Sequence, residues 1–136
     1  MIPLYAAVEV KTHLAPIAVI LIRDKVAAVR LSAVQVHSIM VKTLLEDEGE
    51  AGRLVRVLLA DLVGDLVKSD TWIHRQTYAS LALTLFEESA LDHTQFAQDV
   101  LPNLMELAED RVPNVRLAVA RALKQLKQAS KWTDFE

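Results

Sequence analysis

The chain has 136 residues, enough for one domain or for a short array of repeated units. Hydrophobic residues make up 52% of it, with only three glycines and four prolines, which favours a well-packed helical protein over a β-sandwich or a disordered linker. The net charge of −3 gives no basic field for nucleic acid or an anionic membrane, and the lack of cysteine excludes disulfides and thiolate metal sites.

The first residues lack the basic start and the small-residue cleavage site of a secretory signal. The longest uncharged apolar run, from Leu14 to Ile22, is shorter than the roughly 20 residues that span a bilayer. We therefore expect a soluble intracellular protein, cytoplasmic or nuclear or both, that binds neither membrane nor nucleic acid.

The first two predicted elements are helices over about residues 4–22 and 26–45. Pro16 lies inside the first, where a proline removes a backbone hydrogen bond and kinks the helix at a cost of about 3 kcal/mol. The second helix carries two apolar rows, so we expect neighbours on two sides. The acidic stretch from Glu46 to Glu50 lacks the alternating ligands of a calcium loop and is predicted to be a solvated turn.

Four further helices are predicted, over about residues 52–68, 71–88, 95–108 and 112–129. Ser69 to Thr71 offer turn and N-cap groups before the second of these, and Asp92 or Thr94 could cap the third. Pro113 falls in the first turn of the last helix, where a missing N–H costs little. The tail, residues 130–136, has no helical period.

The chain repeats itself. DKVAAVRL (24–31) returns as DRVPNVRL (110–117) 86 residues later, and Pro16 and Pro102 share that offset. Half of 86 lies within the period of about 40–47 residues that is typical of two-helix HEAT repeats. An altered middle copy, DTWIHR (70–75), is one residue shorter between aspartate and arginine. We predict an all-α, right-handed α-solenoid of three repeats and six antiparallel helices, with repeats at about 1–46, 47–89 and 90–129.

Aspartate and arginine recur at each predicted turn. The aspartates can accept hydrogen bonds from the first amides of the second helix, and each arginine can reach its own or a neighbouring aspartate. We interpret these residues as a structural Asp/Arg ladder, while contact of the arginines with a partner's carboxylate or phosphate is the alternative. The ladder comprises Asp24, Arg30, Asp70, Arg75, Asp110 and Arg116.

The same turns place side chains on one ridge of a solenoid, a surface that can bind partners. Lys25, His74, Arg111 and Asn114 are candidates. Trp72 stands where the flanking copies have valine, and it is either an exposed interface anchor or a core residue; both interpretations stay open.

The sequence carries no recognisable signal for catalysis, a metal or a cofactor. The four histidines (His13, His37, His74 and His93) have no metal-ligand spacing, and the sequence has neither a Gly-rich phosphate loop nor a Gly-x-Ser-x-Gly elbow. His13 and His37 are expected to be satisfied groups at helix surfaces. We predict no catalytic residue, no metal and no cofactor.

The stretch VLPNLMELAE (100–109) followed by DRVPNVRLAVARAL (110–123) resembles the HEAT repeats of protein phosphatase 2A-type scaffold and regulatory subunits. SDTWIHRQTYA (69–79) and QFAQDVLP (95–102) add to the resemblance, which is strong over 69–127 and weaker over 14–45. Those solenoids contain many more repeats than three. In that family the intra-repeat turns hold the catalytic subunit. By position, this implies a turn ridge of Lys25, Trp72, Ile73, His74, Arg75, Arg111 and Asn114.

The resemblance implies a non-catalytic scaffold or regulatory subunit, or a fragment of one, whose partner is a serine/threonine phosphatase catalytic subunit. One alternative is a general HEAT adaptor that binds peptides or cargo on its concave face. Another is an enzyme built on helical repeats, which would need convergent polar residues that the sequence does not show.

The first helix is apolar at nearly every position from Leu14 to Ile22, whereas a terminal repeat should show a polar outer face. This pattern predicts that the helix packs on further repeats or on a second copy of the chain.

Overall fold

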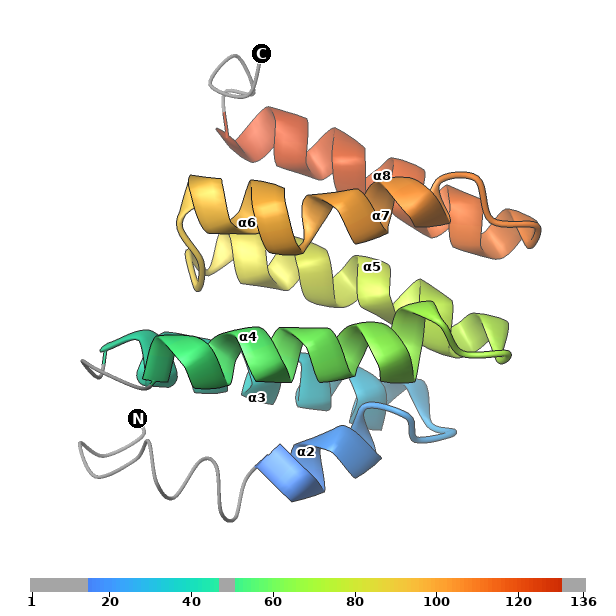
Figure 1. Ribbon diagram of the computed structural model, residues 1–136. Coiled ribbons are helices and arrows are strands. Elements are labelled where there is room, and N and C mark those ends of the chain that lie inside the picture. Colours follow the sequence, from blue (N-terminus) through green and yellow to red (C-terminus); the bar gives the residue numbers. More distant parts are fainter. Residues whose placement is uncertain (1–14, 47–50, 131–136) are drawn as a thin grey trace.

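The computed structural model describes residues 15–46 and 51–130, which form helices joined by short turns (Figure 1). Predictions for residues 1–14, 47–50 and 131–136 lie outside this part of the chain. The elements are α2 (Ala15–Leu21), α3 (Ala27–Glu46), α4 (Ala51–Leu62), the π-helix η2 (Val63–Val67), α5 (Trp72–Glu87), α6 (His93–Asp99), α7 (Leu101–Leu107) and α8 (Pro113–Ser130). The all-α solenoid predicted from the sequence is confirmed.

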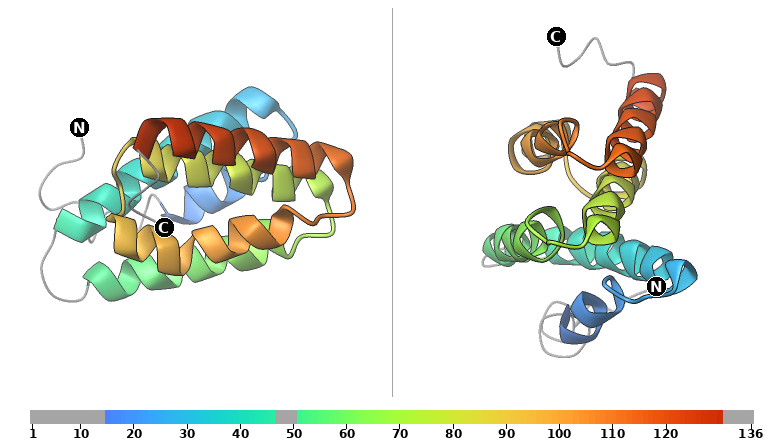
Figure 2. Two further views of the ribbon diagram at one scale, coloured as in Figure 1. Left: turned by 90° about the horizontal axis from the view of Figure 1, so that it is seen from above. Right: turned by 90° about the vertical axis from the view of Figure 1, so that its right-hand side faces the viewer.

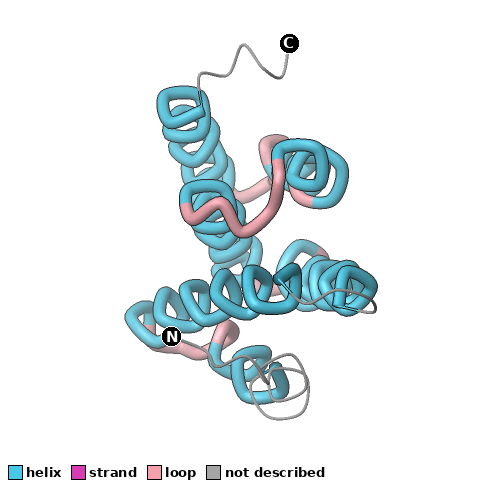
Figure 3. Tube along the Cα trace, turned by 90° about the vertical axis from the view of Figure 1, so that its left-hand side faces the viewer, coloured by secondary structure: helices cyan, strands magenta, loops and turns pink. Residues whose placement is uncertain are grey.

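The helices stack as three hairpins, and the turn inside each hairpin lies at the same end of the stack, on the right in Figure 1. Seen from that end, α4 and the α6–α7 rod form one column, while α5 and α8 form another (Figure 2, right). The view from the opposite end shows the same two columns (Figure 3). Helix α5 packs against both α3 and α8, so the second helices form a continuous layer.

The core is built from Leu, Val and Ala side chains, as the scarcity of aromatic residues requires. Helix α5 lies at its centre, where Leu81 and Ala82 are fully buried and Tyr78 and Leu85 nearly so. Burial of a Leu side chain stabilises the fold by about 1.5–3 kcal/mol, so this central helix carries much of the folding free energy. A single helix hairpin cannot bury its apolar face by itself, so each repeat depends on the adjacent repeats for a core.

The rod formed by α6 and α7 breaks at Val100 (φ −116°, ψ −49°), two residues before Pro102. Proline lacks the N–H that would continue the helical ladder and its ring crowds the preceding turn. The helix break expected of an interior proline is therefore present at Pro102, the repeat counterpart of Pro16. Pro16, by contrast, is the second residue of α2, and the helix predicted before it lies outside the described residues.

The helix predicted over 52–68 ends in a π-helical turn that the sequence did not indicate. The Lys68 N–H donates to the Val63 carbonyl five residues earlier (3.0 Å), in place of the usual four-residue step. The wide turn packs against α5 and α7 and leads directly into the second hairpin turn.

His37 differs from the expectation of a histidine at a helix surface, because it is fully buried in α3. Its Nδ1 lies 2.8 Å from the Ala33 carbonyl oxygen. Burial lowers the pKa of His37, so the neutral imidazole is favoured and donates this bond. Its Nε2 has no hydrogen-bond partner among the described residues.

Candidate functional site

The three hairpin turns share one local design. The Asp24 carboxylate accepts a hydrogen bond from the Val26 N–H (2.8 Å), and the Asp110 carboxylate accepts one from the Val112 N–H (2.9 Å). In the middle turn the Ser69 hydroxyl oxygen accepts the Thr71 N–H (3.1 Å). A polar side chain that bonds the backbone two residues ahead fixes a tight turn before a helix.

An arginine braces each turn from the helix that follows. Nη1 of Arg30 donates to the Asp24 carbonyl (2.8 Å) and the Lys25 carbonyl (2.9 Å). Nη1 of Arg116 donates to the Asp110 carbonyl (2.7 Å), and Nη1 of Arg75 donates to the Ser69 carbonyl (2.9 Å). Each arginine lies six residues after the residue whose carbonyl it binds, so the three turns have the same geometry.

These bonds align Ser69, not Asp70, with Asp24 and Asp110. The middle copy therefore has the same spacing as the others, and the one-residue shortening inferred from the sequence is absent. Asp70 is exposed, and its side chain makes no hydrogen bond within the described part of the chain. Ser69 lies six residues before Arg75, the same spacing as between Asp24 and Arg30 and between Asp110 and Arg116. This spacing was the sequence signal that would have identified Ser69 as the equivalent residue.

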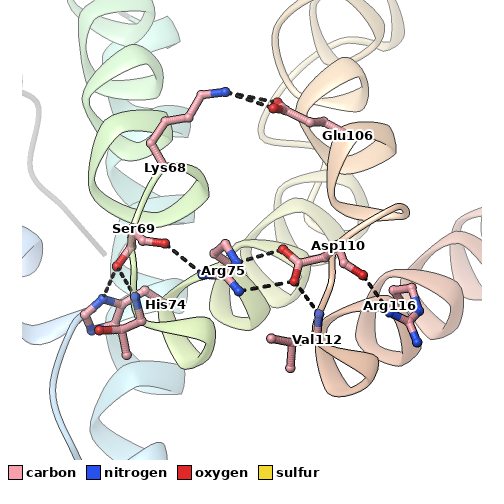
Figure 4. A network of polar contacts seen from close by, with 9 residues as sticks. Lys68, Ser69, His74, Arg75, Glu106, Asp110, Val112 and Arg116 are labelled. Atoms are coloured by element: carbon pink, nitrogen blue, oxygen red, sulfur yellow. Dashed lines mark hydrogen bonds and ion pairs between the residues drawn. The ribbon is translucent and has the colours of Figure 1, made fainter.

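Arg75 also joins the second turn to the third (Figure 4). Its Nε donates to Asp110 Oδ2 (2.7 Å) and its Nη2 to Asp110 Oδ1 (3.2 Å), a bidentate pair in which both side chains are only 8% exposed. The hydrogen bond from Arg75 is the main reason that the pKa of Asp110 lies below its ordinary value. Of the residues in the predicted Asp/Arg ladder, Arg75 and Asp110 link two repeats.

The first and second turns are linked through His74. Its Nδ1 lies 2.8 Å from the Ser69 hydroxyl oxygen, and it also bonds the backbone of Arg23 in the first turn. Burial and the positive charges of Arg23 and Arg30 lower the pKa of His74, so this link uses the neutral ring. The ring nitrogen that faces Ser69 then accepts its hydroxyl hydrogen, while the other donates to the Arg23 carbonyl.

The seven residues of the turn ridge differ in exposure. Lys25, Arg111 and Asn114 are exposed, Trp72, Ile73 and His74 are half-buried, and Arg75 is buried. The Trp72 side chain packs against the hydrophobic core, so much of it belongs to the interior. Because the Arg75 guanidinium is taken up by Asp110 and Ser69, the part of the ridge open to a partner is Lys25, Arg111 and Asn114, with the outer edges of Trp72, Ile73 and His74.

Sequence reasoning also missed a contact beside the ridge. Nζ of Lys68 lies 2.9 Å from Glu106 Oε1, joining the ends of η2 and α7, but both side chains are more than half exposed. An exposed pair of this kind contributes about 0–1 kcal/mol. It marks the side-by-side packing of the second and third repeats and does little to stabilise it.

The described residues contain no group of three or more His, Cys, Asp or Glu side chains that could hold a metal ion. None of the described helices is long and apolar enough to cross a membrane.

Comparison with known proteins agrees with this geometry. The family model of the HEAT repeat matches residues 100–129, which span α7 and α8. The chain is a HEAT-repeat protein. It is 35% identical over 125 residues to serine/threonine-protein phosphatase 4 regulatory subunit 1 of Homo sapiens, and equally to that of Mus musculus and of Rattus norvegicus. The matched region is 92% of this HEAT-repeat chain and 13% of each relative.

No solved structure matches the chain. The relatives are named as regulatory subunits, and together with the HEAT-repeat match this confirms the family predicted from the sequence. Since the chain spans about an eighth of their length (13%), it corresponds to a small part of such a subunit.

Proposed function

We propose that the chain acts as part of a regulatory subunit of a serine/threonine protein phosphatase and binds the catalytic subunit through its turn ridge. The observation that carries the proposal is the 35% identity to phosphatase 4 regulatory subunit 1 over 92% of the chain. The proposed setting is the inside of the cell, in the cytoplasm, the nucleus or both.

The geometry of the turns supports the choice of the ridge. Each turn is braced by an arginine and fixed by a polar side chain, so the backbone that carries the exposed residues is held in place before a partner arrives. Pre-organised groups lose less conformational entropy on binding. Lys25 and Arg111 give the ridge a positive charge that favours an acidic surface on the partner.

The proposed mechanism is positional. The chain supplies no acid, base or nucleophile to the reaction, and its contribution is to hold the catalytic subunit in one orientation relative to the rest of the regulatory subunit. The other proteins bound to the repeat array then determine which phosphoproteins reach the catalytic centre.

Co-purification of the catalytic subunit with the intact protein tests the proposal. The double substitution Lys25→Glu/Arg111→Glu should weaken capture about tenfold or more, since each reversal places like charges at the contact. Arg53→Glu is the control, because Arg53 is exposed near the start of α4, at the end of the stack opposite the turns. Equal capture by the double variant and the wild type would show that the ridge is not the docking surface.

We also propose that the chain self-associates through α2. Ile17 (56%), Ile20 (71%) and Leu21 (38%) are exposed there, beside a hollow of about 330 Å³ between α2 and α3. The proposed occupant is a second copy, because Ile17, Ile20 and Leu21 are three and four residues apart on one face of α2, so the same apolar face of another chain can pack against them.

Sedimentation velocity tests this self-association. Ile20→Asp should shift the chain toward the monomer, and the control Val57→Asp, at an exposed valine of α4, should not. A wild-type chain that is monomeric at high micromolar concentration would rule the proposal out.

A further inference from the structure

The second helices enclose a shallow groove on the face away from the first helices. Its volume is about 350 Å³, and its walls come from α3, α5 and α8, one helix from each repeat. No residue of the first helices of the repeats lines it, within the described chain. The groove therefore runs across the repeats and is a product of their stacking.

Small side chains create the space. Ala79 and Ala122 are nearly fully buried beneath the groove (2% and 3% exposed), and Ala27 and Ala118 lie along its walls. Alanine at these positions lets another polypeptide backbone approach the helices closely. Adjacent helix axes lie roughly 8–10 Å apart, so the path from α3 to α8 is about 16–20 Å. An extended chain covers that length with about five or six residues.

Polar groups line the groove at positions suited to a peptide backbone. Gln76 and Ser80 project from α5 and Gln125 from α8. Their side chains make no hydrogen bond within the described part of the chain, so both the donors and the acceptors of the two amides are available. A peptide in extended conformation presents alternating N–H and C=O groups that need such partners.

The positive charge of the second helices favours an acidic partner. Arg30 on α3 and Arg121 on α8 stand on opposite sides of the groove. Nη1 of Arg30 donates to carbonyls of its own turn, so its Nε and Nη2 are available to bind a partner. Arg121 forms no ion pair among the described residues. Helix α8 carries four basic residues and no acidic one, although the chain as a whole has a net charge of −3.

The first-helix layer has the opposite balance. Its acidic residues are Asp61, Asp65, Asp99 and Glu106, against Arg53, Arg56 and, at the end of η2, Lys68. Positive charge is thus gathered on the second helices, where the groove is. A groove with arginines at both rims and an alanine floor is complementary to carboxylates on an extended chain.

We propose that this groove binds an extended Asp/Glu-rich segment of a partner protein. Arg30 and Arg121 pair with carboxylates of the segment, while Gln76 and Gln125 hydrogen-bond its backbone. The site is separate from the turn ridge, and it does not depend on the proposed phosphatase partner.

Fluorescence anisotropy with a labelled twelve-residue peptide of alternating Asp, Glu and Ala residues tests the proposal. The peptide should bind the chain, binding should weaken with added salt, and the same peptide with Asn and Gln in place of Asp and Glu should bind at least tenfold more weakly. Arg121→Glu should weaken binding of the acidic peptide about tenfold, and Gln76→Ala by a smaller factor. Arg53→Glu, which makes the same charge change outside the groove, should leave binding unchanged.

Three results would overturn the proposal. The first is no binding of the acidic peptide by the wild-type chain. The second is an equal loss in Arg121→Glu and Arg53→Glu, which would indicate attraction by net charge alone. The third is binding only by a phosphoserine version of the peptide, which would show that the groove requires phosphate. Lys25→Glu/Arg111→Glu should not affect peptide binding, so failure here is distinguishable from failure of the ridge.

Discussion

The junction between the first and second turns and the junction between the second and third turns are built from equivalent residues but are held together differently. In the second junction, Arg75 reaches across to the Asp110 carboxylate in a buried bidentate pair. In the first, the equivalent Arg30 stays in its own turn and His74 makes the link through Ser69 and the Arg23 backbone.

One residue accounts for the difference. Where the next turn opens with aspartate, the arginine of the preceding repeat has a carboxylate to bind; where it opens with Ser69, no carboxylate stands at that position. The brace within each turn is therefore a property of the repeat, whereas the bond between repeats depends on a single side chain. Substitutions at these residues, and a change of pH, can separate the brace within a turn from the bond between repeats.

Arg75→Met should have the largest effect. It leaves the Asp110 carboxylate, only 8% exposed, without its charged partner, and breaking a buried pair in this way costs about 3–5 kcal/mol. The free energy of unfolding, measured by urea denaturation, should fall by that amount. Neutralising the carboxylate as well, as in Arg75→Met/Asp110→Asn, should recover part of the loss, because the amide oxygen of the introduced asparagine can still accept the Val112 N–H. The surface control Arg53→Met should change stability by less than about 0.5 kcal/mol. A loss no greater than that of Arg53→Met would refute the buried pair.

Arg30→Met should cost less, about 1–2 kcal/mol by the same measurement, because it removes hydrogen bonds to two carbonyls and leaves no buried charge unpaired. The ratio between this loss and that of Arg75→Met measures the contribution of the ion pair between repeats. Equal losses in the two variants would mean that the turn brace is the whole effect.

Acid should weaken the two junctions at different pH. Folding lowers the pKa of His74 from 6.5, so the unfolded chain binds that proton more readily, and the stability that His74 provides is present above pH 6.5 and lost as the pH falls below it. The pKa of Asp110 is lowered from 3.8, so its contribution is lost only at still lower pH. Urea midpoints from pH 7.5 to 3 should fall in two stages.

The substitution His74→Gln should reduce the first of these stages. The buried His37, whose pKa is also lowered, accounts for what is left of it. Midpoints that stay constant between pH 7.5 and 5 in the wild type would contradict the role given to the neutral histidines.

Ser69→Asp should have the smallest effect, because it exchanges the link through His74 for a carboxylate that Arg30 can reach. We expect a net gain of about 0–1 kcal/mol. The informative measurement is the double-mutant cycle with Arg30→Met, in which a coupling of at least about 0.5 kcal/mol would show that a second bond between repeats has formed. Additive losses would show that Arg30 cannot leave its own turn.

The sequence predicted the helices and the repeat well, because an apolar period sustained over long helices and a recurring turn motif are both strong signals. It placed the middle turn one residue too late, since Asp70 matched the flanking aspartates in type while Ser69 matched them in spacing to Arg75. It also left open whether each arginine binds its own turn or the next. That choice depends on the distance between stacked repeats, which residue order does not contain.

The π-turn and the buried His37 were missed for a different reason. The hydrogen bond from Lys68 back to Val63 spans five residues, but the spacing of apolar residues around it is the same as in an ordinary α-helix. The hydrophobic pattern therefore gave no sign of the π-turn. His37 is buried because of the way α3 packs against the neighbouring helices. From the sequence alone, a polar residue such as histidine is expected at the surface. Trp72 was left between core and interface, and it packs on the core with part of the ring uncovered.

The π-turn also bears on how the array tolerates changes in length. Asp24 and Ser69 are 45 residues apart, whereas Ser69 and Asp110 are 41 residues apart. The three hairpin turns that begin at these residues nevertheless lie at the same end of the stack. A wide helical turn can absorb one inserted residue just before a corner, and Gly64 within it has open space around its α-carbon. Insertions that arise during evolution can thus be taken up inside the helices, leaving the corners in register.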